Sequence, residues 1–85
     1  MRNVCQYLET VLDKRKSFGN KAMVLKFDDG SKVLQSYTTE VARVANGQAK
    51  VYGAFSNTTL RHIKDFLYQE GFGVNTKEEI QSKFM

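Results

Sequence analysis

The sequence contains no proline, a single cysteine and a single histidine. The lone thiol, on Cys5, has no second thiol to pair with, so the fold cannot depend on an internal disulfide and suits a reducing cytoplasm. One histidine and one cysteine would also leave a zinc site dependent on carboxylates, which argues against such a site. We therefore expect no metal and no cofactor.

Long apolar runs are absent as well. Residues 1–13 lack the run of about seven or more apolar residues that a signal peptide requires. Nowhere do about 20 apolar residues, the number that a membrane span needs, occur together. We expect a protein that is neither exported through a signal peptide nor inserted in a membrane.

The composition is that of an ordinary globular protein. The 85 residues, 41% of them hydrophobic and 26% charged, are too few for two domains, so we treat residues 1–85 as a single domain. A domain of this size buries only about 60 to 65% of its unfolded surface, which makes its core thin. A protein partner or a second copy of the chain would add stability.

Regularly spaced turn residues divide the middle of the chain into strands. Asp28-Asp29-Gly30-Ser31 and Asn46-Gly47 are flanked by runs rich in β-branched and aromatic residues. Gly, Asn and Asp tolerate the positive φ that tight hairpin turns require. Thr38 and Thr39 fit a bend or bulge between two strands. The predicted strands are 22–27, 32–37, 40–45 and 49–55.

A helix is expected after the strands, over 58–70. Oxygen acceptors at Ser56-Asn57-Thr58-Thr59 can cap its first free N–H groups. Its apolar side chains fall within one arc, and they are Leu60, Ile63, Phe66 and Leu67. Gly71 ends the helix, because glycine adopts the left-handed conformation that lets Phe72 fold back over the last turn.

A short second helix is expected over about 77–83. Thr76 and Glu79 have the spacing of a capping box, in which each side chain accepts a hydrogen bond from the other residue's backbone N–H. Ile80 and Phe84, four residues apart, would lie on one side of it.

The N-terminal segment fits two structures. Its apolar residues have the helical spacing i, i+3, i+4, i+7, i+8, whereas residues 7–12 would also serve as a strand buried on both faces. These apolar residues are Val4, Tyr7, Leu8, Val11 and Leu12. Periodicity alone favours the helix.

The charge favours an anionic partner. Thirteen basic residues against nine acidic ones give a net charge of +4, which suits nucleic acid or an acidic protein surface. Three residues of helix 58–70 form a basic and aromatic stripe beside its apolar arc, where cations would neutralise phosphates and a tyrosine would stack on a base. With nearby cations, the predicted contact residues are Lys14, Arg15, Lys16, Lys21, Arg61, Lys64 and Tyr68. The alternative is a solvated face in which Arg61 pairs with Asp65.

Three further residues are candidates for a partner interface. His62, predicted to be partly exposed near the sheet edge, would contact a partner or a phosphate, or would serve as a structural hydrogen-bonding histidine. Tyr37 and Tyr52, together with Phe55, would form an exposed aromatic platform on the sheet, or would belong to the core.

No motif predicts an enzyme. Nucleophilic catalysis needs a nucleophile, a base and an orienting group, and Cys5 is far in sequence from the only histidine, His62. Gly71-Phe72-Gly73 follows a helix rather than opening one, unlike a phosphate-binding loop. We expect no catalytic residue, with Cys5 as a small, partly buried core residue.

Two segments of the chain resemble a family of small uncharacterised proteins and domains encoded by bacteriophages and prophages. They are Ser36-Tyr37-Thr38-Thr39-Glu40-Val41-Ala42 and Ser56-Asn57-Thr58-Thr59-Leu60-Arg61-His62-Ile63-Lys64-Asp65-Phe66-Leu67, and the resemblance covers about residues 7–73. That family usually has Glu at the position of Asp65, and it has no established catalytic or ligand-binding residue. The resemblance implies a phage or prophage origin, with the cytoplasm of a bacterial host as location. It also implies a β-rich sheet ending in a helix, and it favours a strand over residues 7–12.

The predicted fold is therefore α+β. An antiparallel meander of three to four strands is covered on one face by helix 58–70, and the short terminal helix packs at the edge. The other face of the sheet is less polar than a solvated face should be, which indicates dimerisation through the sheet. The residues expected there are Val24, Val33, Val41 and Tyr52.

The function that these observations favour is that of a small, non-enzymatic, phage-type accessory protein that binds nucleic acid. The alternative is a phage counter-defence inhibitor that binds a host protein stoichiometrically, such as a CRISPR or other defence nuclease, or that binds its signalling molecule. A structural role in the virion is a third option. The partners considered are thus nucleic acid, a host protein and a second copy of the chain, but no membrane.

Overall fold

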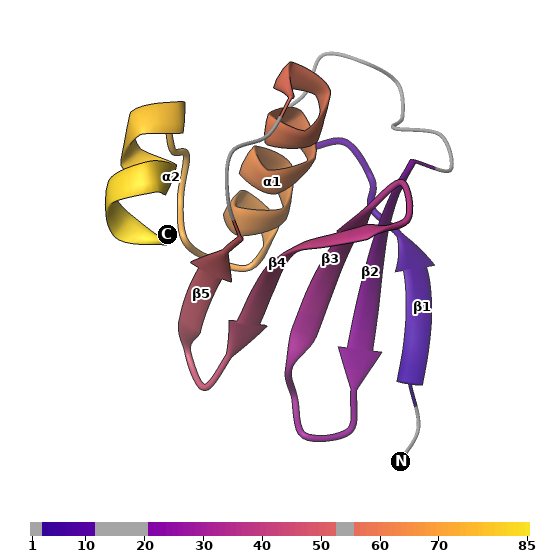
Figure 1. Cartoon of the computed structure of the whole chain (residues 1–85). Helices are drawn as coiled ribbons and strands as arrows, with labels where there is room; N and C mark the ends of the chain where they lie inside the picture. The colour runs from indigo at the N-terminus through magenta and orange to yellow at the C-terminus, as the bar shows by residue number, and fades with distance from the viewer. Residues whose placement is uncertain (1–2, 12–20, 53–55) are drawn as a thin grey trace.

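The computed structural model describes residues 3–11, 21–52 and 56–85, which form an antiparallel sheet of five strands and two helices (Figure 1). The strands are β1 (Asn3–Tyr7), β2 (Ala22–Phe27), β3 (Lys32–Ser36), β4 (Thr39–Ala45) and β5 (Gln48–Val51). The helices are α1 (Asn57–Gln69) and α2 (Lys77–Lys83). Each strand pairs with the next one in the chain. The α+β class is confirmed, with one or two strands more than predicted.

Two of the predicted turns are present. Asn46 and Gly47, between β4 and β5, have φ values of 55° and 76°, as a two-residue hairpin turn requires. In the turn between β2 and β3, Ser31 donates two hydrogen bonds to Asp29 Oδ1, from its N at 2.9 Å and from its Oγ at 2.6 Å. These hydrogen bonds hold the pKa of the Asp29 carboxyl below its usual value.

The turn between β3 and β4 lies one residue earlier than predicted. Ser36 pairs with Thr39, so Tyr37 and Thr38 form the connection, and Tyr37 has a φ of 57°. This hairpin also has a β-bulge, which lies within the paired part of β3 and β4 and not at the turn. The register shifts after Leu34, which leaves Val41 of β4 without a partner in β3. Because of this bulge, two successive residues of β4, Val41 and Ala42, both enter the core.

The N-terminal segment is a strand, but it ends where the predicted strand begins. β1 stops at Tyr7, and Leu8 then enters the core. The backbone after Leu8 turns to α1 instead of the sheet: the N–H of Val11 donates to both carboxylate oxygens of Asp65 at 3.0 Å. Of the described apolar residues with helical spacing, only Leu8 is buried, and Val4, Tyr7 and Val11 are more than half exposed, so the spacing does not correspond to a buried face. Leu12 lies outside the described residues.

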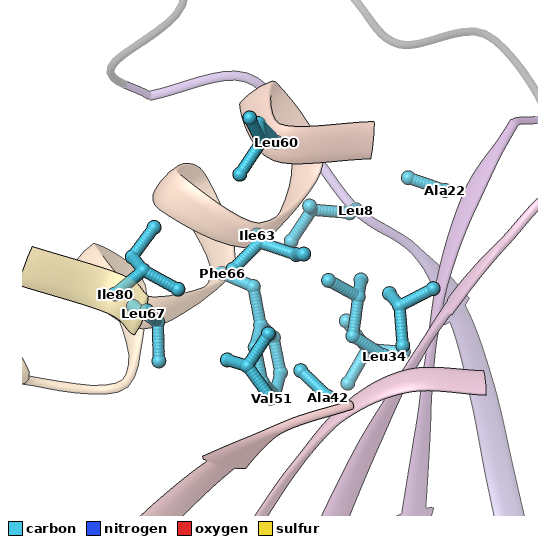
Figure 2. Packing of buried hydrophobic residues seen from close by; sticks show 12 residues of the cluster. Leu8, Ala22, Leu34, Ala42, Val51, Leu60, Ile63, Phe66, Leu67 and Ile80 are labelled. Atoms are coloured by element: carbon cyan, nitrogen blue, oxygen red, sulfur yellow. The ribbon is translucent and has the colours of Figure 1, made fainter. Parts of the chain in front are cut away.

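The hydrophobic core lies between α1 and one face of the sheet (Figure 2). The predicted arc of α1 is confirmed, since its four apolar residues are buried, three of them with no exposed surface. They meet Val24, Leu34, Ala42 and Val51 of the sheet, together with Ile80 of α2. Burying a large apolar side chain contributes about 1.5 to 3 kcal/mol, so this single layer supplies most of the hydrophobic stabilisation.

The face of the sheet away from α1, here called the open face, carries different residues from those predicted. Met23 pairs with Gln35 and Leu25 pairs with Val33, whereas Val24 and its partner Leu34 are in the core. Because side chains alternate between the two faces of a strand, Met23, Leu25 and Phe27 lie on the open face. Val24 and Val41 belong to the core, so their prediction for this face was wrong, whereas Val33 is on the open face. Alternation in β2 is misleading, because its fully apolar set, Met23, Leu25 and Phe27, lies on the open face, whereas the set that contains Lys26 supplies Ala22 and Val24 to the core.

Helix α1 is capped at its N-terminus and terminated at its C-terminus by the residues that the sequence predicts. Ser56 caps α1 by accepting a hydrogen bond from the N–H of Thr59 at 3.2 Å. After α1, Gly71 has a φ of 92°, and Phe72 folds back over the helix, its N–H donating to the carbonyl of Leu67 at 2.9 Å.

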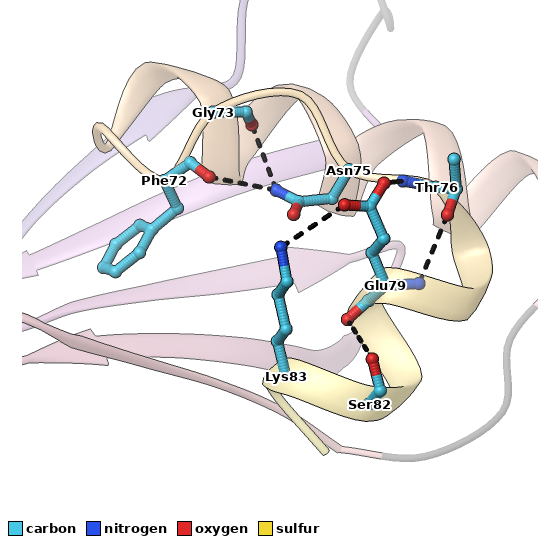
Figure 3. A network of polar contacts seen from close by, with 7 residues as sticks. All are labelled: Phe72, Gly73, Asn75, Thr76, Glu79, Ser82 and Lys83. Carbon is cyan, nitrogen blue, oxygen red and sulfur yellow. Dashed lines mark hydrogen bonds and ion pairs between the residues drawn. The ribbon is translucent and has the colours of Figure 1, made fainter.

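The capping box of α2 is complete (Figure 3). The N–H of Thr76 donates to Glu79 Oε1 at 3.0 Å, and the N–H of Glu79 donates to Thr76 Oγ1 at 3.2 Å. Lys83 reaches the other carboxylate oxygen of Glu79 at 3.3 Å. Phe84, just after α2, packs edge-on against Phe72 with 5.8 Å between ring centroids.

Of the two described helices, neither is long and apolar enough to cross a membrane.

Replacing Glu79 by Gln tests the charge in the capping box. The hydrogen bond from the Thr76 N–H, followed by Lys83, lowers the pKa of Glu79 below its usual value of 4.5. A depressed folded-state pKa stabilises the fold above the unfolded-state pKa, and this stabilisation is lost as the pH falls through the folded-state value. Urea titrations of both proteins should therefore show wild type as more stable at neutral pH.

Below pH 4.5 that difference should shrink, because the wild-type carboxyl becomes neutral too. Gln keeps an oxygen that can accept the hydrogen bond from Thr76. A difference that stays constant at all pH values would contradict a role of the Glu79 charge.

Candidate functional site

The predicted stripe on α1 faces solvent. Arg61 is exposed, Lys64 is half-buried and the Tyr68 side chain is 42% exposed. Asp65, the single acidic residue of α1, is turned inward and has no exposed surface. The outer surface of α1 therefore presents two cations and a phenol ring without a carboxylate from the same helix.

Asp65 has a structural position rather than the predicted place on a solvated face. Besides Val11, its carboxylate accepts a hydrogen bond from Gln69 Nε2 at 2.8 Å. Gln69 Nε2 also donates to the carbonyl of Glu9 at 2.8 Å. A buried carboxylate needs such donors, and here they fasten the segment after β1 to the side of α1.

The other predicted cations are only partly placed. Lys14, Arg15 and Lys16 lie outside the described residues. Lys21 is exposed just before β2, and its carbonyl accepts a hydrogen bond from the N–H of Tyr37 at 2.6 Å. Lys21 therefore lies at the β3–β4 turn, next to the flank of α1 that faces the sheet.

His62 is buried, with 1% of its surface exposed, so its prediction as a partly exposed interface residue was wrong. Its Nδ1 lies 2.9 Å from Ser36 Oγ, and Ser36 Oγ lies 3.3 Å from Thr59 Oγ1. The small side chain of Ser36 at the end of β3 leaves room for the imidazole ring under α1. The geometry supports the alternative prediction, that His62 is a structural histidine with a hydrogen bond inside the fold.

Tyr37 remains a surface residue. Its side chain is 52% exposed, and its ring centroid is 6.2 Å from that of His62. A positive φ costs a non-glycine residue about 1 to 2 kcal/mol. Two hydrogen bonds hold this backbone, the one to Lys21 and one that the carbonyl of Tyr37 accepts from Gln35 Nε2 at 3.3 Å.

Tyr52 lines a hollow that the sequence analysis did not anticipate. The hollow has a volume of about 460 Å³ beside the β4–β5 hairpin, and Tyr52 is 40% exposed there. Its cationic lining residues are Arg43, Lys50 and Lys83. Arg43 and Lys50 are directly opposite each other on β4 and β5. The Asn46-Gly47 turn fixes this pairing, so the sequence held a usable signal for it.

A second hollow, of about 590 Å³, lies between β1, β2 and the end of α1. Its charged lining residues are Glu9, Lys26 and Glu70, so both signs are present. Glu70 also forms an ion pair with Lys32, with 2.8 Å between Oε1 and Nζ. Because its lining carries both signs of charge, this hollow favours neither an anionic nor a cationic ligand.

Cys5 is exposed on the open face, not partly buried as predicted. His62 lies in the core layer on the other side of the sheet, so the structure does not bring the two together. Among residues 3–11, 21–52 and 56–85, no three His, Cys, Asp or Glu side chains gather as metal ligands would.

The model of a family of unknown function, DUF8033, matches residues 7–82 of the chain. No curated protein and no solved structure matches it.

Replacing Ser36 by Ala tests the buried contact with His62. Losing a hydrogen-bond partner of a buried polar group costs about 1 to 3 kcal/mol of the free energy of unfolding. Ser82→Ala is the matched control, because Ser82 is an exposed serine of α2 whose Oγ donates to the carbonyl of Glu79. Urea denaturation should show a clear loss for Ser36→Ala and little change for Ser82→Ala. Equal effects would contradict the buried contact.

Proposed function

The chain belongs to the DUF8033 family of unknown function, and we propose that it is a small, non-enzymatic protein that binds nucleic acid. The observation that supports this best is the outer surface of α1, with Arg61, Lys64 and Tyr68 side by side. A phage or prophage origin is part of the same proposal, and it rests on the resemblance of the helix motif.

The chemistry of the α1 stripe suits a phosphate backbone. Arg and Lys attract phosphates at long range and release counterions when they bind, while an exposed tyrosine offers a stacking surface to an unpaired base. Two carboxylates of this part of the chain are engaged in the fold: Asp65 is buried, and Glu70 is paired with Lys32. The net charge of +4 adds a favourable field for an anionic ligand.

The non-enzymatic part of the proposal is supported by the positions of His62 and Cys5. The His62 ring is buried against Ser36 and Thr59, where it supports the fold. Cys5 is on the opposite side of the sheet. We infer that the protein acts by binding.

The test is fluorescence anisotropy with labelled single-stranded and duplex DNA and RNA, from about 50 to 200 mM salt. We expect binding that weakens steeply with salt, and a loss of about tenfold in the Arg61→Ala/Lys64→Ala variant at low salt. The salt slope should fall by about 1 for each phosphate contact removed. Tyr68→Leu should weaken binding to single strands more than to duplexes.

The control variant is Lys26→Ala/Lys77→Ala, which removes the same charge from residues that do not belong to the stripe. It should bind nearly as wild type does. Equal losses in the two double variants would assign the binding to net charge alone. Absence of binding at the lowest salt would exclude the proposal.

The second candidate is a protein that acts by stoichiometric binding to another protein, as a counter-defence inhibitor would. The specific observation in its favour is the apolar half of the open face, formed by Cys5, Tyr7, Met23, Leu25 and Phe27. This half has no charged side chain, while cations and carboxylates lie on β4 and at the turns. A second copy of the chain, with the same uncharged half, is the partner that we propose to test first.

Light scattering after size exclusion tests dimerisation through this face at about 50 and 200 mM salt. We expect a dimer that persists at the higher salt, because apolar contacts are not screened. Leu25→Lys should give a monomer, whereas Gln81→Lys, which adds the same charge on the exposed side of α2, should not. A wild-type monomer at all concentrations would exclude dimerisation.

A further inference from the structure

The hollow beside the β4–β5 hairpin has the size and chemistry of a small-ligand site. Its volume of about 460 Å³ falls within the range of about 300 to 1,000 Å³ that small-molecule pockets occupy. The side chains that could contact a polar ligand there are Arg43, Asn46, Gln48, Lys50, Tyr52 and Lys83. Three of these side chains are cationic and none is a carboxylate.

Two cations of this hollow repel each other when no anion lies between them. Arg43 and Lys50 are directly opposite each other across the β4–β5 ladder, where like charges destabilise a sheet. No ion pair engages either one within the described part of the chain. Asp29 is close enough for Arg43 to contribute to lowering its pKa, after the hydrogen bonds from Ser31, but Asp29 does not line the hollow. An anion between Arg43 and Lys50 would remove this repulsion.

Lys83 adds a third cation from another element. Its ion pair with Glu79, at 3.3 Å, is between two partly exposed side chains and is therefore weak. The ammonium group can turn from Glu79 toward an anion in the hollow at little cost.

Tyr52 supplies an aromatic surface beside these cations. The backbone around it is held on two sides: its N–H donates to the carbonyl of Val41 at 3.0 Å, and the N–H of Val51 donates to the carbonyl of Phe84 at 2.8 Å. The second hydrogen bond also ties the residues after α2 to the edge of β5. The ring and the cations thus come from neighbouring, hydrogen-bonded segments, which limits the ordering that a ligand must impose.

We propose that this hollow binds one nucleotide unit, with its phosphate between Arg43 and Lys50 and its base against Tyr52. Lys83 completes the phosphate contact, and the amides of Asn46 and Gln48 are available to the sugar and the base. The unit is either a free mononucleotide or the phosphorylated end of a single strand, since both present the same groups. The proposal does not rest on the α1 stripe, which is formed by a different element.

The experiment is an NMR titration of ¹⁵N-labelled protein with AMP, adenosine and inorganic phosphate. AMP should shift the backbone amides of the hairpin and of Tyr52 and should bind at least about tenfold more tightly than either fragment. Such a preference requires that phosphate and base bind together. Comparison of AMP with a 5′-phosphorylated dinucleotide then distinguishes a free nucleotide from a strand end, according to which one binds more tightly.

Two variants test the residues. Arg43→Gln/Lys50→Gln should weaken AMP binding at least about tenfold and should not lower the melting temperature, because it removes a repulsion. Tyr52→Leu should reduce the affinity for AMP to that for inorganic phosphate.

The matched control is Arg61→Gln/Lys64→Gln, which also removes one arginine and one lysine but on the α1 stripe. It should keep AMP binding even if it abolishes binding to long nucleic acids, so the two proposals can fail separately. Equal affinities for AMP and adenosine, or equal effects of the two double variants on AMP binding, would overturn the nucleotide site. So would the absence of any shift at about 1 mM AMP.

Discussion

The seating of α1 on one face of the sheet is the contact on which the rest of the structure depends. Ile63, Phe66 and Leu67 have no exposed surface, and the sheet residues below them form the only extensive core of the described chain. Polar contacts fix the rotation of the helix on both sides of that apolar strip: Asp65 holds the backbone of Val11, and His62 meets Ser36. The rotation in turn determines which side chains face solvent.

Four of the nine acidic side chains have contacts that serve the fold. Asp29 is bonded within a turn, Asp65 is buried, and Glu79 completes a capping box. Glu70 is paired with Lys32. Two groups of cations lie on the outer side of α1 and on the β4–β5 hairpin, and each group has a half-exposed tyrosine beside it. These two groups are the places where we propose that anionic ligands bind.

Local signals predicted the elements of this fold well, because turn and cap residues act over a few positions. Asn46-Gly47, Ser56 and the pair Thr76 and Glu79 each determine a local backbone geometry, and the turn, the N-cap and the capping box are all present. The orientation of β2 was not predictable in this way. Its larger apolar side chains lie away from α1, and the core takes the smaller Ala22 and Val24, which alternation alone does not predict.

The same limit applies to the candidate site. The exposure of Arg61 and Tyr68 follows from the helical period, so the stripe could be predicted. The burial of His62 depends on Ser36, which is 26 residues away, and no periodicity describes that contact. Arg43 and Lys50 form a pair only when the hairpin register is worked out residue by residue. Features of one element could be predicted from the sequence, whereas contacts between elements largely could not.

The hydrogen bonds between Val11 and Asp65 join residues 54 positions apart, and this separation has a consequence for the order in which the chain is made. On the ribosome, all five strands emerge before α1 does, and each can pair with the strand just completed. During that interval both faces of the sheet are uncovered, and the segment after β1 has no helix to bind. The newly made sheet therefore depends on the last third of the chain for its cover, and synthesis that stops before residue 57 leaves two apolar faces open to aggregation.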